Sequence, residues 1–328
     1  MRILVTEETY REYGERARGI AGDADFVRYG EDGSLRDEAG RLLDAGTEDV
    51  EVVWATHDLF VGRGYVRFFE LLVPSPTLRW FQSPGAGTDG AFFTGLVERG
   101  VRLTTSHATS IPISEFVLRS VLDAYQRPER WVEVRNARRW DHHVMREVFG
   151  TTWLIVGLGA IGSDVAVRAR AFGARVIGCR RHPTGHEPVD EMITPPQLLD
   201  HVGAADVVVI SAPATPESHH LVDATFLAAM RPASVLVNVA RGSLVDEGAL
   251  LEALEVGRPE LAILDAVAAE PPPEGSPLWE HPRIVLTPHN SFAGDGNDRR
   301  NVELFMENLR RYVAGDALLN EQGPVASA

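Results

Sequence analysis

The sequence predicts an α/β fold made of two doubly wound, parallel-sheet domains, and three observations lead to that prediction. The chain has 328 residues, about twice the length of a typical domain. Short apolar runs alternate with amphipathic stretches along most of the chain, as they do where helices cross between parallel strands. Six such runs follow residue 152, which is enough for a complete doubly wound domain.

The N-terminal part contains four expected strands. They are Arg2–Val5, Val50–Trp54, Leu78–Phe81 and Val101–Thr104. Turn-forming residues such as Glu31-Asp32-Gly33 interrupt the amphipathic stretches between them. This alternation favours a parallel sheet with crossover helices. The third strand leads into a glycine-rich turn at Pro84–Gly87.

Helices are expected on either side of a second series of strands. Ser114–Tyr125 has apolar residues near helical spacing, Pro128 can start the next helix at Glu129, and Arg299–Val313 has a helical pattern. Most of the intervening strands are uninterrupted apolar runs, typical of strands buried on both faces. These strands are Trp153–Val156, Arg175–Gly178, Val207–Ser211, Val235–Val239, Ala262–Asp265 and Ile284–Leu286.

Composition excludes several classes of protein. Acidic residues outnumber basic ones 47 to 32, for a net charge of −15, which argues against a nucleic-acid or anionic-membrane partner. The single cysteine, Cys179, excludes an internal disulfide and fits a reducing compartment. The first ten residues do not resemble a signal peptide, and no apolar run reaches the length of a membrane span. We therefore expect a cytoplasmic protein.

The chain contains no lysine, so all 32 basic residues are arginine. This excludes phosphate-binding loops of the GKS or GKT type, Schiff-base enzymes and dehydrogenases with a catalytic lysine.

A glycine-rich loop predicts a dinucleotide site. Gly157-Leu-Gly-Ala-Ile-Gly162 fits GxGxxG and lies between an apolar strand and the helical stretch Ser163–Phe172. Gly157 permits the tight turn, Gly159 lets the backbone approach a pyrophosphate, and Gly162 lets helix and strand pack closely. The amides of Ala160 and Ile161 would then face the phosphates at the helix N-terminus. The alternative is a strand–helix turn without a ligand.

The next strand end predicts which dinucleotide binds. An NAD site has an acidic residue there, about 20 residues after the glycines. Arg180 and Arg181 stand there instead, followed by His182. Guanidinium groups suit a 2′-phosphate, so we expect NADP(H) to be preferred over NAD(H). The alternative is a pair of solvated surface arginines.

Three later motifs place an arginine, a carboxylate and a histidine just past successive strands. Arg241 follows the fourth strand, Glu270 the fifth and His289 the sixth, so all three are expected at the carboxyl edge of the sheet with the cofactor loop. There Arg241 can hold a substrate carboxylate and polarise its 2-oxo oxygen. His289 can exchange a proton with that oxygen, while Glu270 orients His289 and keeps it protonated near neutral pH.

Each of these side chains also has a simpler interpretation. Arg241 fits a helix-end cation or a surface ion pair, Glu270 an acid before the turn Pro271–Pro273, and His289 a loop residue after Thr-Pro. Because all three follow strands of one domain, we favour the joint functional interpretation.

With these residues in place, the chain resembles the D-isomer-specific 2-hydroxyacid dehydrogenase family, and within it the glyoxylate/hydroxypyruvate reductases, over nearly its full length. The resemblance is carried by four segments in order, GLGAIG, NVARGSLVDEGAL, LDAVAAEPPPEGSPLW and LTPHNS. The family's Arg, Glu and His fall on Arg241, Glu270 and His289. Formate dehydrogenases of the same superfamily are expected to carry Gln in place of Glu270, so that branch is disfavoured.

The resemblance implies a domain arrangement. A Rossmann-like cofactor domain, residues 105–289, would be inserted into a flavodoxin-like substrate domain, residues 1–104 plus 290–328. It also implies a homodimer built on the cofactor domains. No metal is expected, because the adjacent histidines His142–His143 and His219–His220 cannot point at one ion.

The resemblance also assigns roles to residues outside the glycine loop. Backbone amides of Gly85, Ala86 and Gly87, in the turn Ser83–Asp89, would hold the substrate carboxylate. Three further residues would contact the cofactor: Pro213, Val239 and Asp265. Asp265 would lie near the nicotinamide amide, the alternative being a strand-end acid that caps a neighbouring turn.

The resulting prediction is an oxidoreductase that transfers a hydride between NADP(H) and a small 2-oxo acid or D-2-hydroxy acid, such as glyoxylate or hydroxypyruvate. The alternative is a dinucleotide-sensing binding protein, similar to co-repressors of the same fold. Thr104–Pro112 and Asn290 depart from the family's pattern. Trp140 and His142–His143 lie where members of the family vary. A partner subunit could bring them near the site, but aromatic packing of Trp140 and a solvated histidine pair are the favoured interpretation.

Overall fold

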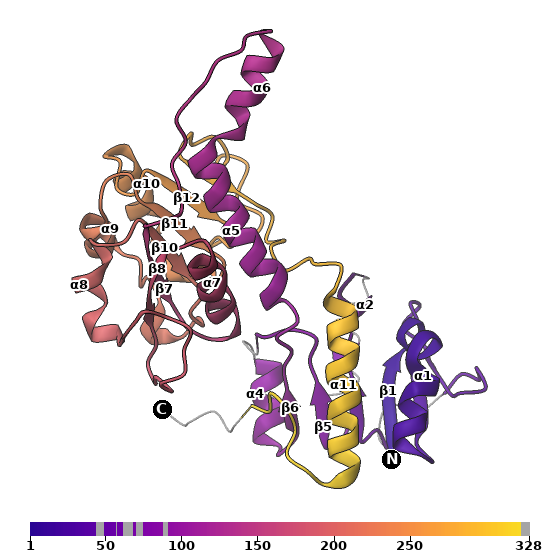
Figure 1. Ribbon diagram of the computed structural model, residues 1–328. Coiled ribbons are helices and arrows are strands. Elements are labelled where there is room, and N and C mark those ends of the chain that lie inside the picture. Colours follow the sequence, from indigo (N-terminus) through magenta and orange to yellow (C-terminus); the bar gives the residue numbers. More distant parts are fainter. Residues whose placement is uncertain (44–48, 57, 62–67, 70–74, 88–90, 323–328) are drawn as a thin grey trace. The chain divides into compact units, whose positions relative to one another are not determined.

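The computed structural model divides the chain into two compact units (Figure 1). It describes all residues except 44–48, 57, 62–67, 70–74, 88–90 and 323–328. One unit comprises Met1–Thr109 and Asp295–Ala328, and the other comprises Ser110–Gly294. The boundaries expected from the sequence, 104/105 and 289/290, lie five residues before these. Each unit is built on a largely or wholly parallel sheet, which confirms the predicted fold class.

The first unit has a six-stranded sheet in the order β3-β2-β1-β4-β5-β6. Its pairs are parallel except β2–β3, which is antiparallel. The strands are β1 (Arg2–Thr6), β2 (Asp25–Tyr29), β3 (Leu35–Arg36), β4 (Val52–Trp54), β5 (Trp80–Gln82) and β6 (Arg102–Thr104). The four strands expected here are confirmed, whereas β2 and β3 were not predicted.

Side chains alternate between the two faces of this sheet, as strand geometry requires. Ile3 and Val5 of β1 pack with Phe305 on one face, whereas Leu4 packs on the other. Phe305 stacks on Trp54 with ring centroids 4.0 Å apart. The helices of the unit are α1 (Glu7–Ala21), α2 (Asp58–Val61), α4 (Ala91–Glu98) and α11 (Asn297–Ala314).

The second unit has a seven-stranded, all-parallel sheet in the order β13-β12-β11-β10-β7-β8-β9. The strand order reverses between β7 and β10, so the crevice beside these two strands is the place where such sheets bind ligands. The strands are β7 (Thr152–Val156), β8 (Arg175–Cys179), β9 (Glu191–Ile193), β10 (Val207–Ile210), β11 (Val235–Asn238), β12 (Leu261–Leu264) and β13 (Ile284–Leu286). Six of these were expected, and β9 was not.

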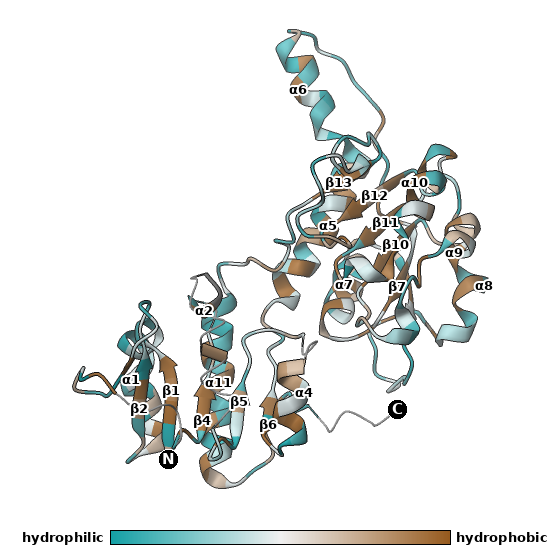
Figure 2. Ribbon diagram, turned by 180° about the vertical axis from the view of Figure 1, so that it is seen from behind, coloured by the Kyte–Doolittle hydropathy of each residue, from teal (hydrophilic) through white to brown (hydrophobic). Residues whose placement is uncertain are grey.

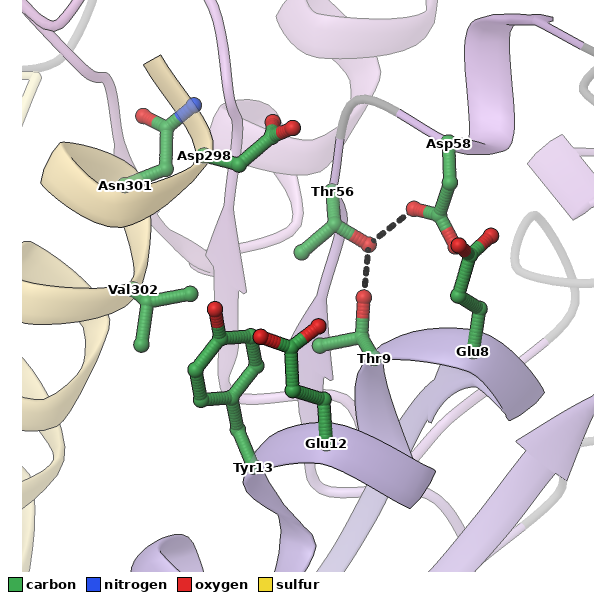
Figure 3. A pocket seen from close by; sticks show the side chains of 9 residues that line it. All are labelled: Glu8, Thr9, Glu12, Tyr13, Thr56, Asp58, Asp298, Asn301 and Val302. Carbon is green, nitrogen blue, oxygen red and sulfur yellow. Dashed lines mark hydrogen bonds between the residues drawn. The ribbon is translucent and has the colours of Figure 1, made fainter. Parts of the chain in front are cut away.

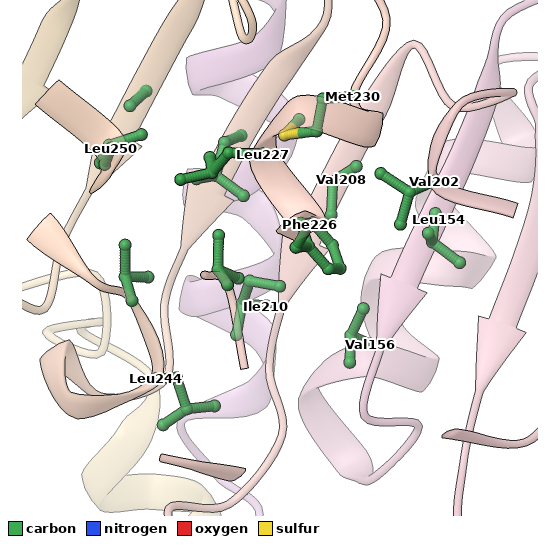
Figure 4. Close-up of a cluster of buried hydrophobic side chains, with 14 of the residues drawn as sticks. Leu154, Val156, Val202, Val208, Ile210, Phe226, Leu227, Met230, Leu244 and Leu250 are labelled. Atoms are coloured by element: carbon green, nitrogen blue, oxygen red, sulfur yellow. The ribbon is translucent and has the colours of Figure 1, made fainter. Parts of the chain in front are cut away.

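Two apolar layers cover this sheet. Residues of α5 and α7 pack on one face, and residues of α8, α9 and α10 pack on the other, where Phe226 and Leu227 meet Val208 (Figure 4). Figure 2 shows that the central strands of the sheet are its most hydrophobic part. The helices are α5 (Ser110–Gln126), α7 (Ala160–Ala171), α8 (Leu198–Val202), α9 (Ala224–Ala229) and α10 (Glu247–Glu255). Short 3₁₀ turns are η1 (Pro195–Gln197), η2 (Pro216–Ser218), η3 (Gly242–Leu244) and η4 (Pro277–Trp279).

Helix α6 (Pro128–Asn136) stands away from the rest of the second unit (Figures 1 and 2). It buries none of its residues, and the segment after it exposes Trp140 and Val144 almost completely. Helix α6 and the segment after it, residues 128–146, are called the arm below. Arg146 fixes the base of the arm, because it donates to Asp206 Oδ1 at 2.6 Å and lies over the Tyr125 ring. The arm is therefore anchored at its base and solvent-exposed along its length.

Candidate active site

The turn after β7 fits only glycine at two positions. Gly157 has a φ of +98°, and a Cβ there would lie 2.5 Å from the Cα of Ala212. A Cβ on Gly162 would lie 2.0 Å from the carbonyl oxygen of Gly157. The loop is therefore a close-packed strand–helix turn of the kind that GxGxxG predicts.

The middle glycine of the motif, Gly159, faces open space. Gly159 is the N-cap of α7, no side chain caps the helix there, and a Cβ on Gly159 would meet nothing within 4 Å. Helix α7 therefore begins with uncapped first-turn amides, contributed by Ala160, Ile161 and Gly162, beside a backbone that a ligand can approach closely. These features fit a dinucleotide pyrophosphate.

Two cofactor residues expected from the resemblance follow neighbouring strands. Pro213 is exposed after β10, and its carbonyl oxygen accepts from Ser218 Oγ at 2.8 Å. Val239 is buried directly after β11. Ser211 Oγ donates to the carbonyl oxygen of Gly157 at 2.8 Å, so the loop after β10 packs against the glycine loop. Both residues thus lie at the carboxyl edge of the sheet.

The two arginines after β8 differ in their surroundings. Arg180 Nη1 lies 3.3 Å from Glu187 Oε1. Arg181 is more exposed, and its Nη2 lies 3.9 Å from Glu217 Oε2. His182 is exposed and adjoins them. The loop therefore presents two guanidinium groups, of which Arg180 is the better fixed.

Glu187 organises this loop and was missed by the sequence analysis. Its carboxylate accepts from the backbone N–H of Thr184, from Thr184 Oγ1 and from the N–H of Gly185. These bonds, led by that from the Thr184 N–H, lower the pKa of Glu187 to about 2. No motif marks an acid seven residues after Arg180, so only the folded loop reveals the contact between the two side chains.

The structure brings His289 and Glu270 together. His289 Nδ1 lies 2.8 Å from Glu270 Oε2, and both side chains are partly exposed. The other oxygen, Oε1, accepts from the N–H of Val267 at 3.2 Å. His289 has a φ of +48°, an uncommon conformation for a residue with a side chain. Such a strained position at a strand end is typical of a functional site.

Arg241 follows β11, the strand beside β12. Its backbone is extended, and its half-buried side chain donates from Nη1 to the carbonyl oxygen of Ala240 at 2.8 Å. The three residues thus follow β11, β12 and β13, which are adjacent parallel strands. This places all three at one edge of the sheet.

Both carboxylate oxygens of Asp265 accept hydrogen bonds from the loop that carries His289. It is 1% exposed, and Oδ1 accepts from Thr287 Oγ1 at 2.7 Å and from the N–H of Asn290 at 3.0 Å. Oδ2 accepts from the N–H of Ser291 at 3.1 Å. The capping alternative therefore describes its contacts within the chain, and the nicotinamide contact stays a prediction.

The expected carboxylate-binding turn lies in the first unit. Gly85 is partly buried and its carbonyl oxygen accepts from the N–H of Ser106 at 2.9 Å, whereas Ala86 and Gly87 are exposed. The last two residues of this turn, 88 and 89, lie outside the described residues. The substrate-binding role of the turn stays a prediction.

The first unit also contains an acidic cavity of about 80 Å³ beside the carboxyl ends of β1 and β4 (Figure 3). Thr9 Oγ1 donates to Thr56 Oγ1 at 3.0 Å, and Thr56 Oγ1 donates to Asp58 Oδ1 at 2.5 Å. Among the residues that the structure describes, the side chains that line the cavity include four carboxylates and no cation: Glu8, Thr9, Glu12, Tyr13, Thr56, Asp58, Asp298, Asn301 and Val302. The four carboxylates give the cavity a negative potential, which does not favour an anionic ligand.

Within the described residues, no three His, Cys, Asp or Glu side chains are grouped so that they could hold a metal ion. No helix in the described part of the chain is long and apolar enough to cross a membrane.

Comparisons with known proteins agree on one family. Residues 118–291 match the family model described as D-isomer specific 2-hydroxyacid dehydrogenase, NAD binding domain. The chain is 35% identical over 280 residues to glyoxylate/hydroxypyruvate reductase B of Pectobacterium atrosepticum, an alignment that covers 82% of this chain and 87% of that protein. It is 33% identical over 255 residues to D-3-phosphoglycerate dehydrogenase of Mycobacterium bovis, covering 75% of this chain and 47% of the relative. The chain therefore spans about half the length of such relatives.

Solved structures share the whole fold. A D-isomer specific 2-hydroxyacid dehydrogenase family protein from Aeromonas salmonicida is 27% identical, with a TM-score of 0.78 over 99% of both chains. A D-isomer specific 2-hydroxyacid dehydrogenase from Xanthobacter autotrophicus, solved with NADPH and MES, is 27% identical, with a TM-score of 0.73 over 98% of both chains.

Proposed function

Because the chain belongs to the D-isomer specific 2-hydroxyacid dehydrogenase family, we propose that it is an oxidoreductase that reduces a small 2-oxo acid to a D-2-hydroxy acid, and catalyses the reverse. The observation that carries this proposal is the 2.8 Å contact between His289 Nδ1 and Glu270 Oε2, with Arg241 after the strand next to β12. When bound, a nicotinamide dinucleotide supplies or accepts the hydride at the substrate's second carbon.

His289 exchanges the proton of the reaction. Its Nδ1 faces Glu270, so Nδ1 carries the hydrogen of that bond and Nε2 is left to serve the substrate. In reduction, Nε2 gives a proton to the 2-oxo oxygen as the second carbon gains a hydride. The product is a hydroxyl group, and His289 recovers its proton from solvent. Glu270 holds the imidazole in this orientation.

Arg241 binds the anionic end of the substrate. A guanidinium group can hold a carboxylate through two parallel hydrogen bonds. The same group polarises the adjacent 2-oxo bond, because negative charge develops on that oxygen as the second carbon is reduced. Arg241 thus serves both binding and chemistry.

Glyoxylate and hydroxypyruvate are the substrates we propose. Support comes from the Pectobacterium relative, which is a glyoxylate/hydroxypyruvate reductase and shares 35% identity over most of both chains. Both compounds are small 2-oxo acids with the carboxylate that Arg241 requires.

NADP(H) is the cofactor we propose over NAD(H). The strand end after β8 carries Arg180 and Arg181 in place of an acid, and guanidinium groups bind a phosphate well. The Xanthobacter structure, 27% identical to this chain, was solved with NADPH.

A homodimer through the second unit is the assembly we propose. Trp140 and Val144 on the arm are 91% and 98% exposed, and exposed apolar side chains of this kind mark an interaction surface. Light scattering of the protein and of a Trp140→Arg variant tests this: the parent should have twice the mass of the chain, and the variant should be a monomer.

A panel of 2-oxo acids assayed with NADPH and NADH tests the proposed function. Glyoxylate and hydroxypyruvate should be turned over at about 1–10³ per second, the ordinary range for enzymes, and NADPH should give the higher kcat/KM. Cofactor binding without turnover of any 2-oxo acid would contradict the proposal and favour a dinucleotide-sensing protein.

A further inference from the structure

The side-chain amide of Asn238 joins the two loops that carry Arg241 and Glu270. Asn238 ends β11 and is completely buried. Its Nδ2 donates to the carbonyl oxygen of Arg241 at 3.0 Å and to that of Ala266 at 3.0 Å. Its Oδ1 accepts from the N–H of Ala240 at 3.1 Å. One side chain therefore ties the loop after β11 to the loop after β12.

The two loops are in close backbone contact at the same place. A Cβ on Gly242 would lie 1.9 Å from the carbonyl carbon of Val267, so only glycine fits there. Glu247 Oε1 accepts from the N–H of Ala268 at 2.7 Å. The loop from Ala266 to Glu270 is thus held against the Arg241 loop, and Asn238 supplies its buried polar contact.

The chemistry of Asn238 is specific to this position. The buried carbonyl oxygen of Ala266 needs the Asn238 amide as its donor, and the amide's own oxygen needs an N–H. The carbonyl oxygen of Arg241 accepts from the Leu244 N–H at 3.2 Å as well as from Asn238. A carboxamide provides both functions on one planar group, whereas a carboxylate provides acceptors only. A buried carbonyl that loses its donor is costly, so the loop that carries Ala266 would move to find another.

We propose that Asn238 is a positioning residue that sets the placement of Arg241 relative to the Glu270–His289 pair. This inference rests on the function proposed above for those three residues. Glu270 contacts the imidazole directly, so a shift of its loop moves the proton donor relative to the group that holds the substrate. A misplacement of about 1 Å lowers turnover by about 10²-fold.

Two substitutions separate this role from a merely structural one. Asn238→Asp keeps the shape of the side chain and puts an acceptor where Nδ2 stands, while Asn238→Ser keeps one short donor. Asp206→Asn is the matched control. Asp206 is also buried and polar, and it directly precedes β10, so it lies at the amino ends of the strands of the same sheet. It accepts from Arg146 and from the N–H of Thr152.

Kinetics give the first measurement. We expect Asn238→Asp to lower kcat by about 10²-fold and to raise KM for the 2-oxo acid, with the cofactor Kd, titrated by fluorescence, within about twofold. The kcat and KM of Asn238→Ser should lie between those of Asn238→Asp and the parent. If Asn238→Asp does not fold, the kinetics of Asn238→Ser provide the test. Asp206→Asn should lower the thermal midpoint and leave kcat and KM unchanged. The proposal is overturned if the Asn238 variants change kcat and KM no more than this control.

Amide hydrogen exchange gives a second measurement, made without substrate or cofactor. Asn238→Asp should speed exchange in residues 265–270 by about tenfold or more, and Asp206→Asn should not. Unchanged exchange in that segment contradicts the bridging role whatever the activity. If the parent protein reduces no 2-oxo acid, the proposed function is overturned. The exchange measurement still tests whether Asn238 joins the two loops, because it needs no activity.

Discussion

At the residue scale, the position of His289 depends on partners that are far away in the sequence. Asp265 accepts from the side chain of Thr287 and from the N–H groups of Asn290 and Ser291, which encloses the left-handed residue between them. Glu270 then fixes the ring through Nδ1. The residue types at these strand ends predicted a proton donor with an orienting acid, and the structure adds the means by which its loop is held.

Arg241→Lys tests whether this arginine serves both binding and chemistry. Lysine keeps the charge but loses the planar group that binds a carboxylate at two points. We expect steady-state assays to show a higher KM for the 2-oxo acid together with a kcat lower by about tenfold or more. A change in cofactor Kd alone would instead place Arg241 in the dinucleotide site.

Cys179 provides a test of burial at the end of β8. The thiol is 3% exposed, and burial raises its pKa to about 11. Iodoacetamide at pH 8 should therefore leave the native protein unmodified and label it in guanidinium, where thiol pKa values are about 8.5. The native state keeps this proton longer than the unfolded chain, so its contribution to stability is lost as pH rises from about 9 towards 11. Rapid labelling of the native protein would contradict the buried position.

At the element scale, the predictable strands are those with uninterrupted apolar sequence. β10 and β11 are buried along their whole length, and such runs are typical of strands in a sheet covered on both faces. The strands that were missed, such as β2 and β9, begin with Asp25 and Glu191 and lie towards the edges of their sheets. Their pairing partners, rather than local sequence, make them strands.

The loop after β8 is predicted to set the preference for NADPH over NADH. Arg180→Asp, alone and with Arg181→Ala, removes the cations proposed to bind the 2′-phosphate and adds the acid typical of an NAD site. The ratio of kcat/KM for NADPH to that for NADH should fall by about tenfold or more, the effect of losing a hydrogen bond to a charged group. Glu217→Gln, beside Arg181, is the control and should leave the ratio nearly unchanged. A parent that already favours NADH would contradict the assignment.

At the scale of the whole molecule, the order of the strands along the chain and their parallel topology explain why the grouping of Arg241, Glu270 and His289 could be predicted. Three motifs spaced over about fifty residues meet because they follow β11, β12 and β13, which are adjacent in one parallel sheet. That juxtaposition follows from topology alone. The turn-capping contacts of Asp265 were one of the two predicted alternatives. The bridges made by Asn238 and Glu187 could not be predicted, because each depends on the geometry of side chains and loops after folding.

The turnover of a His289→Asn variant tests the proton-transfer role of His289. Asparagine tolerates the positive φ of this position, so the loop should keep its shape. The control is His201→Asn, because His201 Nε2 also lies close to a carboxylate oxygen, 3.1 Å from Glu191 Oε1. We expect His289→Asn to lower kcat for glyoxylate or hydroxypyruvate by about 10²–10⁴-fold with cofactor affinity intact, and His201→Asn to leave kcat nearly unchanged. A His289→Asn enzyme with near-native turnover would contradict the account.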